Sequence, residues 1–291
     1  MTTAYDRIKS LSFWKEPVDP KPLDGGITNV SYVVAHQREK FVVRLGDDIP
    51  VHQVMRFNER AASEAAFKVG VSPEVVHAEQ GVLIIRFIEG KTFSPEDVRE
   101  PHNLERIVAL IRKVHDEMPK QLRGPAQVFW VFHVLRDYAH TLREAGSRHM
   151  PHLNELLETA CELERDVGAI TVVYGHNDLL AANFLGEEQR IWLIDWDYAG
   201  FNSPLFDLAN LASNNELSAE QEQFVLGTYF GARPSLALQR QYSAMKCASL
   251  LRESMWSMVS EIHSKLDFDY KSYTADNLAR YKRALEHRQK N

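Results

Sequence analysis

The most informative segment of the sequence places a histidine, an aspartate and an asparagine in one short loop. His176 and Asp178 follow a β-branched strand pattern, and Asn183 comes five positions after the aspartate. A second strand pattern, residues 191–194, ends at Asp195-Trp196-Asp197. Phosphoryl transfer needs metal ions that neutralise the triphosphate and a carboxylate that orients the attacking hydroxyl and accepts its proton. Mg²⁺ prefers hard oxygen ligands, so this spacing predicts a site that uses ATP and Mg²⁺.

Each of these side chains has a predicted role. We expect Asp178 to be the catalytic base and His176 to brace the loop by hydrogen bonding. Asn183 and Asp195 would hold Mg²⁺, with Asp197 as a candidate additional ligand. Isolated Asp and Asn residues commonly cap turns, but here two strand contexts and a second acidic motif favour catalysis.

A second pattern near the N-terminus could bind phosphate. Paired glycines let the backbone approach phosphate oxygens, although they also form plain turns; the candidates are Gly25, Gly26, Thr28 and Asn29. Arg44 follows among strand hydrophobics, where it either reaches solvent or serves a ligand. A partly buried guanidinium needs a counter-charge, and Glu59 and Glu64 on the next predicted helix are the candidates.

These residues must be positioned by two differently patterned parts of the chain. Strand patterns dominate before residue 90, at 27–35, 40–45, 74–77 and 82–88, with helices at 1–14 and 51–69. Helical periodicity dominates from Leu104 onward, at 104–114, 129–145, 153–167 and after 207, and short strands interrupt it at 170–174, 183–185 and 191–194. We therefore expect an α+β fold with a strand-rich nucleotide-binding lobe of five strands and one main helix, residues 1–90. A helical catalytic and substrate-binding lobe, residues 91–291, would face it across a ligand cleft.

The bulk properties exclude several classes of protein. The 291 residues are 44% hydrophobic and carry a formal net charge of −6, so no basic excess suggests a nucleic-acid partner. The two cysteines, Cys161 and Cys247, are too few for a disulfide framework or a zinc site and favour a cytoplasmic location. The sequence contains no run of 18 apolar residues, so a membrane-spanning helix is not predicted.

Taken together, these motifs resemble the choline/ethanolamine kinase family, within the larger aminoglycoside-phosphotransferase-like group, over nearly the whole chain. The resemblance implies a protein-kinase-like two-lobe fold and phosphorylation of the hydroxyl of choline, ethanolamine or a similar amino alcohol by ATP. Residues 25–29 would form the nucleotide loop, and Arg44 would stand in the position of a lysine. Glu59 would be its ion-pairing acid. Residues 86–90 look like the hinge between the lobes, where the backbone around Arg86 and Ile88 would meet adenine.

The resemblance also implies a substrate pocket in the C-terminal helices. Trp256 matches one of the family's two pocket tryptophans, but Glu253 replaces the other, and Tyr198 could supply a further aromatic face. Cation–π attraction to a quaternary ammonium reaches about 2 kcal/mol when it is desolvated. The loss of an aromatic wall and the gain of an acid suit a cation that keeps N–H donors, such as ethanolamine, or a different substrate. Without the resemblance, Trp256 reads as a core tryptophan.

Two alternatives stay open. The acceptor could be an aminoglycoside, thiamine or a sugar, because one scaffold can serve many alcohols. The chain could also be a nucleotide-binding pseudokinase, although the presence of Asp178, Asn183 and Asp195 argues against this. The sequence leaves open whether the chain forms a homodimer.

Overall fold

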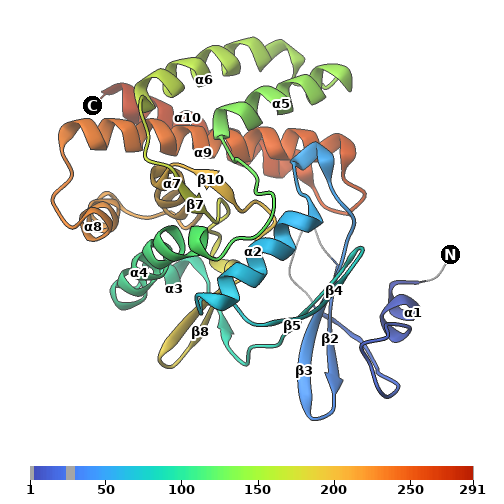
Figure 1. Ribbon diagram of the computed structural model, residues 1–291. Coiled ribbons are helices and arrows are strands. Elements are labelled where there is room, and N and C mark those ends of the chain that lie inside the picture. The colour runs from blue at the N-terminus through green and yellow to red at the C-terminus, as the bar shows by residue number, and fades with distance from the viewer. Residues whose placement is uncertain (1–2, 24–29, 291) are drawn as a thin grey trace.

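The computed structural model describes residues 3–23 and 30–290. Its first part is a five-stranded antiparallel sheet in the order β1-β2-β3-β5-β4, and the rest is largely helical (Figure 1). The sheet strands are β1 Lys21–Leu23, β2 Val30–His36, β3 Glu39–Leu45, β4 Val75–Glu79 and β5 Val82–Arg86. The predicted α+β organisation is therefore confirmed.

The later strands form two small sheets that carry the loops of the helical part. One sheet pairs β7 Val173–Gly175 with β10 Gly200–Asn202, and the other has the order β6-β8-β9. Its strands are β6 Lys91–Thr92, β8 Phe184–Glu187 and β9 Arg190–Leu193. The chain leaves the five-stranded sheet at Arg86, and Lys91 already pairs with Gly186 of β8.

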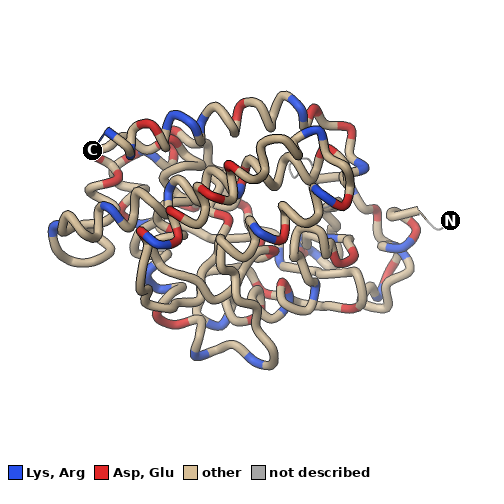
Figure 2. The backbone as a smooth tube through the Cα atoms, turned by 90° about the horizontal axis from the view of Figure 1, so that it is seen from above, with Lys and Arg blue, Asp and Glu red and all other residues tan. Residues whose placement is uncertain are grey.

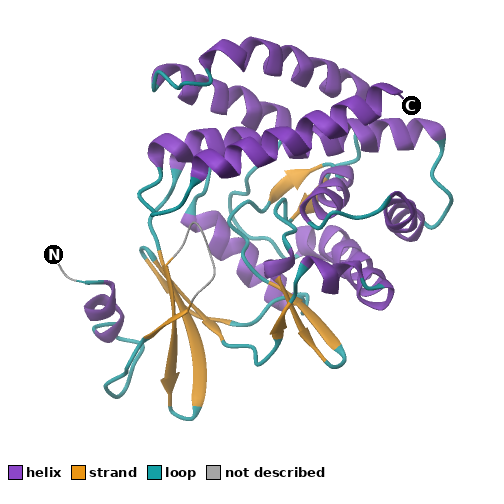
Figure 3. Ribbon diagram, turned by 180° about the vertical axis from the view of Figure 1, so that it is seen from behind, coloured by secondary structure: helices purple, strands orange, loops and turns teal. Residues whose placement is uncertain are grey.

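Ten α-helices are assigned within the described residues. They are α1 Ala4–Lys9, α2 Arg56–Lys68, α3 Pro95–Arg99, α4 Pro101–Glu117, α5 Val131–Glu144, α6 Leu153–Val167, α7 Pro204–Asn214, α8 Ala219–Phe230, α9 Leu236–His263 and α10 Tyr270–Lys290. The long helix α9 packs against α5, α6, α7 and α10 (Figure 3). None of the helices in residues 3–23 and 30–290 combines the length and apolarity needed to cross a bilayer.

Two of the predicted helices are shorter than expected. The helix expected at 51–69 begins only at Arg56, because Pro50–His52 forms a 3₁₀ turn and Gln53 adopts a left-handed backbone with φ 59°. A left-handed residue cannot continue a right-handed helix. The helix expected at 1–14 is limited to α1, where Thr3 caps the first turn by accepting a hydrogen bond from the Asp6 N–H.

The hydrophobic core consists of two clusters. The smaller one joins the five-stranded sheet to α1 through Ile8, Val34, Phe41, Val43 and Ile84. The larger one fills the helical part, and it also contains the apolar face of α2, with Ala62, Ala65 and Ala66. A cavity of about 610 Å³ lies between the first turn of α2 and strands β3 and β5. By packing, α2 therefore belongs to the helical part although it lies within the first ninety residues.

Charged residues of both signs are distributed along the whole chain. Figure 2 shows lysine and arginine interspersed with aspartate and glutamate on most helices and loops. This mixed distribution agrees with the modest net charge of −6.

Candidate active site

The loop after β7 is held in place by hydrogen bonds to side chains of α7. This helix starts at Pro204, and the side chain of Ser203 caps it by accepting a hydrogen bond from the Leu205 N–H at 3.2 Å. Proline is favoured at the first helical position because its missing N–H would be unpaired there in any case. One turn further on, Asp207 Oδ2 accepts the His176 N–H at 2.8 Å, and Asp207 Oδ1 accepts the Asn177 N–H at 2.7 Å.

Asp207 is a fully buried anchor for this loop. Its Oδ2 also accepts a hydrogen bond from His115 Nε2 at 2.9 Å. Burial alone would raise the pKa of Asp207, but the hydrogen bond from His115 and the nearby histidines hold this pKa below its usual range. Gly175 allows the close approach, because a Cβ there would lie 3.0 Å from Asp207 Oδ2.

The same face of α7 holds the loop at a second point. Asn210 lies three residues after Asp207, and its Oδ1 accepts the Leu179 N–H at 2.5 Å. Asn215 Nδ2 donates to the Leu179 carbonyl at 2.9 Å. Positions i and i+3 share one helix face, so the backbone of the buried loop finds its partners there. No role for Asp207, Asn210 or Asn215 was predicted from the sequence.

His176 connects the two loops that carry the acidic motifs. Its Nε2 donates to the carbonyl of Ile194 at 2.9 Å, and its Nδ1 accepts the Asp178 N–H at 3.3 Å. Burial lowers the pKa of His176, so the ring is neutral with its proton on Nε2. Asp195 follows directly in a left-handed backbone with φ 68°, a conformation that aspartate tolerates better than most residues.

The structure brings Asp178, Asn183 and Asp195 to one place. Burial raises the pKa of Asp178 to about 8; Arg252 opposes this shift, and the charges of Glu253 and Asp195 add to it. Asn183 Nδ2 donates to the Asp178 carbonyl at 2.8 Å, which leaves its Oδ1 available. The Asp195 side chain is 31% exposed. Among the described residues, no three His, Cys, Asp or Glu side chains gather as a metal-binding cluster.

Two arginines bridge the sheet, α2 and the Asp195-Trp196-Asp197 motif. Arg44 contacts Glu59 at 2.7 Å, Asp195 at 2.9 Å and Asp197 at 3.3 Å. Arg56, which the sequence analysis did not single out, contacts Glu59 at 2.6 Å and Asp197 at 2.9 Å. The predicted ion pair of Arg44 with Glu59 is therefore present.

The other acid considered as a partner for Arg44 lies elsewhere. Glu64 pairs with Arg60 at 2.8 Å on the exposed side of α2. Burial would lower the pKa of Arg44, but Asp195, Glu59 and Asp197 raise it above its ordinary value. The guanidinium is therefore held between three carboxylates.

The remaining predicted nucleotide contacts are less defined. Gly25, Gly26, Thr28 and Asn29 lie outside the described residues. Arg86 ends β5, and its side chain pairs with Glu74 at 2.9 Å and also with Glu39. Ile88 is half-buried in the connection between β5 and β6. The Arg86 side chain is thus engaged within the sheet.

A buried arginine that the sequence analysis missed lies beside Asp178. Arg252, in α9, is 2% exposed; its Nη1 lies 3.0 Å from Glu253 Oε2 and 3.8 Å from Asp178 Oδ1. Its guanidinium stands 4.3 Å from the centre of the Tyr198 ring. Its Nε and Nη2 have no hydrogen-bond partner among the described residues. A charged Arg-Glu pair inside the apolar run 247–259 was the available sequence signal.

The aromatic residues predicted for the pocket contact one another. Trp256 Nε1 donates to the Tyr198 hydroxyl at 2.8 Å, and the Trp256 ring stacks on His52 at 5.1 Å between centroids. The Tyr273 hydroxyl donates to Glu253 Oε1 at 2.8 Å. Trp256 is only 4% exposed. Its burial agrees with the reading of Trp256 as a core tryptophan.

Comparison with known proteins identifies the family. The choline/ethanolamine kinase family matches residues 21–225. Protein LicA of Haemophilus influenzae is 29% identical over 92% of this chain and 81% of its own length. Ethanolamine kinase 2 of Homo sapiens is 26% identical over 92% of this chain and 76% of its own length.

Solved structures agree with these relatives. A choline/ethanolamine kinase family protein from Mesorhizobium loti has a TM-score of 0.79 and 26% identity, covering 97% of this chain and 94% of that chain. Spectinomycin phosphotransferase APH(9)-Ia, in complex with ADP and spectinomycin, has a TM-score of 0.62 at 11% identity, covering 93% and 94%. This second likeness shows the protein-kinase-like fold alone. The family match, the relatives and the architecture lead to one conclusion: the chain belongs to the choline/ethanolamine kinase family, whose members are phosphotransferases with an alcohol group as acceptor.

Proposed function

We propose that this chain transfers the γ-phosphoryl group of ATP to the hydroxyl of a small alcohol that carries a primary ammonium group, such as ethanolamine. The observation that carries the proposal is that Arg252 lies beside both Asp178 and Glu253 in a largely buried cluster next to Asp195. Asp178 would orient the hydroxyl and accept its proton. Binding and orientation, without a covalent phospho-enzyme, would supply most of the rate enhancement.

The residues present fit a magnesium ion. Asn183 and Asp195 offer an amide oxygen and a partly exposed carboxylate, which is the hard oxygen donor set that Mg²⁺ prefers, completed by phosphates and water. When bound, the ion would neutralise charge on the triphosphate. Asp195 pairs with Arg44 but keeps 31% of its side chain exposed, whereas the Asp197 side chain is only 4% exposed and pairs with both Arg44 and Arg56. We therefore assign Asp195 as the carboxylate ligand and assign Asp197 to holding the two arginines.

The preference for a primary ammonium follows from what already covers the aromatic rings. Arg252 stacks over Tyr198, and Trp256 stacks on His52, so a trimethylammonium group would compete with existing partners for these faces. Once Asp178 is ionised, its carboxylate, that of Glu253 and the Arg252 guanidinium leave one negative charge, which a single bound cation would balance. Because a primary ammonium donates hydrogen bonds, it can bind Asp178 or Glu253, whereas a quaternary ammonium has no N–H to donate.

One observation favours a second candidate substrate. The Nε and Nη2 of Arg252 form one edge of the guanidinium and have no partner among the described residues. Such an edge suits an acceptor oxygen. An alcohol rich in oxygen acceptors, such as a sugar, is therefore the alternative acceptor for the same reaction.

Substrate preference can be measured directly. With Mg-ATP present, we expect kcat/KM for ethanolamine to exceed that for choline by about tenfold or more, since a charged hydrogen bond contributes roughly 1.5–3 kcal/mol. The variant Glu253→Trp should reduce this ratio by restoring an aromatic wall. Kinetics with ethanolamine, choline, kanamycin and glucose would test the proposal. A ratio that favours choline in the unmodified protein would contradict the primary-ammonium assignment, and turnover of glucose alone would favour the alternative.

Catalysis should depend on pH through Asp178. The pKa of this carboxyl is raised to about 8, and a base must be deprotonated, so kcat/KM should rise with pH and reach half its maximum near pH 8. Arg252→Gln removes the positive charge that lowers this pKa, and the midpoint should move to higher pH. The exposed change Lys282→Gln on α10 is the control and should leave it in place. A midpoint that Arg252→Gln does not move would contradict the assignment.

A further inference from the structure

A second cavity lies away from the candidate active site. It has a volume of about 990 Å³ and is walled by the end of α7 and by α8, α9 and α10. None of the residues predicted for catalysis, metal or substrate lines it. Its volume lies at the upper end of the range for small-molecule sites. The cavity is therefore large enough for a ligand and is separate from the proposed chemistry.

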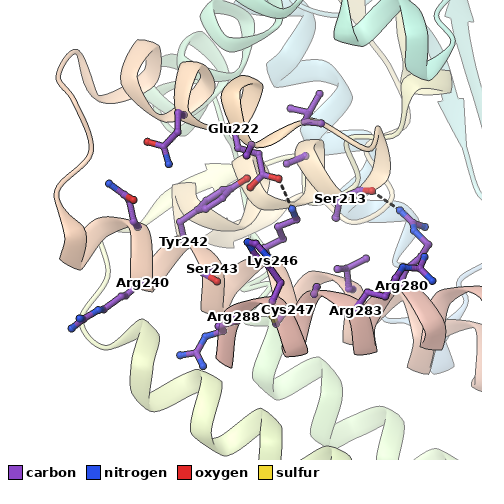
Figure 4. A pocket seen from close by; sticks show the side chains of 18 of the residues that line it. Ser213, Glu222, Arg240, Tyr242, Ser243, Lys246, Cys247, Arg280, Arg283 and Arg288 are labelled. Atoms are coloured by element: carbon purple, nitrogen blue, oxygen red, sulfur yellow. Dashed lines mark hydrogen bonds and ion pairs between the residues drawn. The ribbon is translucent and has the colours of Figure 1, made fainter. Parts of the chain in front are cut away.

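The charge of this cavity is opposite to that of the whole protein. Five basic side chains and two acidic ones line it, an excess of three positive charges, whereas the chain carries a net −6. The basic residues are Arg240, Lys246, Arg280, Arg283 and Arg288. In Figure 4, Lys246 reaches Glu222 near the centre, Arg280 and Arg283 lie at one end, and Arg240 and Arg288 lie at the other. The field of the cavity attracts anions.

Several of these donors have no acceptor within the described part of the chain. Arg240 and Arg283 are exposed, and neither forms a hydrogen bond or ion pair with a described residue. Arg288 pairs with Asp166 through Nη2, but its buried Nε lacks a partner in the described chain. Buried donors are normally satisfied, so the orphaned Nε of Arg288 is an independent sign that a ligand supplies an acceptor here.

The wall of the cavity also suits the body of a ligand. Burial and the nearby Glu222 charge raise the pKa of Tyr242, so its phenol stays protonated, and Leu217, Leu236 and Leu250 add apolar surface. Arginine forks bind phosphate oxygens in pairs. We propose that this cavity binds a phosphorylated small molecule at a site distinct from the catalytic one.

The test compares two charge-matched double variants of the full chain. Arg240→Ala with Arg283→Ala removes the two cavity cations that have no partner in residues 3–23 and 30–290, and Lys271→Ala with Lys282→Ala removes two exposed cations of α10 outside the cavity. Isothermal titration with inorganic pyrophosphate in Mg²⁺-free buffer is expected to show binding to the unmodified protein. The first pair should weaken this binding by about tenfold or more, and the second by less than about twofold.

The same titrations identify the source of the phosphate. AMP and O-phosphoethanolamine are used in turn, and whichever binds in a manner sensitive to Arg240 and Arg283 shows whether the site takes a nucleotide or a phosphate ester. Pyrophosphate binding that both double variants retain would assign the anion to the catalytic site and overturn the proposal. Absence of binding to the unmodified protein would also overturn it. Neither outcome bears on whether the chain phosphorylates an amino alcohol.

Discussion

Replacement of Asp178 by Asn should lower kcat by about a thousandfold, a typical effect of removing a positioned general base. The amide keeps the size of the side chain but cannot accept the proton of the substrate hydroxyl. Nucleotide affinity should change little, because Asn183, Asp195 and Arg44 are unaltered. Steady-state ADP release and equilibrium binding of Mg-ATP measure the two effects separately.

The same substitution should also change how the stability of the protein depends on pH. A carboxyl whose pKa is raised by folding stabilises the protein below its ordinary pKa, and this stability is lost as pH rises through about 8. Asp178→Asn should therefore fold normally and lose less stability than the unmodified protein as pH rises from about 4, the ordinary pKa of aspartate, to about 8. The exposed change Asp116→Asn on α4 is the control for both assays. Near-normal kcat in Asp178→Asn would remove the residue from its proposed role as base.

Replacement of Asp207 by Ala should destabilise the protein by about 3–5 kcal/mol, as expected when one partner of a buried charged network is removed. The backbone N–H groups of His176 and Asn177 and the Nε2–H of His115 would all lose their acceptor. A loss of this size lowers the thermal midpoint by several degrees in a protein of this length. Thermal and urea unfolding measure it.

The control for Asp207→Ala is also a substitution of an exposed residue. Asp116→Ala removes an aspartate that is 64% exposed and should change stability by less than about 0.5 kcal/mol. Since folding keeps the pKa of Asp207 low, its stabilising effect should be lost as pH falls below the usual aspartate range. Equal stability of Asp207→Ala and the control would show that α7 does not anchor the loop.

The predictable part of this protein was the part encoded locally. The helix at 153–167 has the predicted bounds, and the spacing of Asp178, Asn183 and Asp195 was readable because Asp178 follows β7, Asn183 directly precedes β8 and Asp195 follows β9. The ion pair of Arg44 with Glu59 came from the family resemblance, since nothing local distinguishes Glu59 from Glu64.

What could not be predicted depends on contacts between distant segments. Arg252 lies 74 positions from Asp178 and reaches it only because the fold brings α9 to the loop. Asp207 and Arg56 likewise gain their roles from partners that have no fixed sequence separation. The break at Gln53 was also hidden, because the apolar spacing continues through a residue whose backbone is left-handed.

The packing of α2 has a consequence for how the two parts of the protein can move. Its apolar face is buried in the helical core, whereas its first turn borders a cavity of about 610 Å³ and contacts the sheet through the Arg44–Glu59 ion pair. Opening of the protein would therefore leave α2 in place. The five-stranded sheet and α1 would move together as one rigid body relative to α2 and the helical part. Arg44 belongs to the sheet and Glu59 to α2. The distance between their side chains would therefore report the degree of closure.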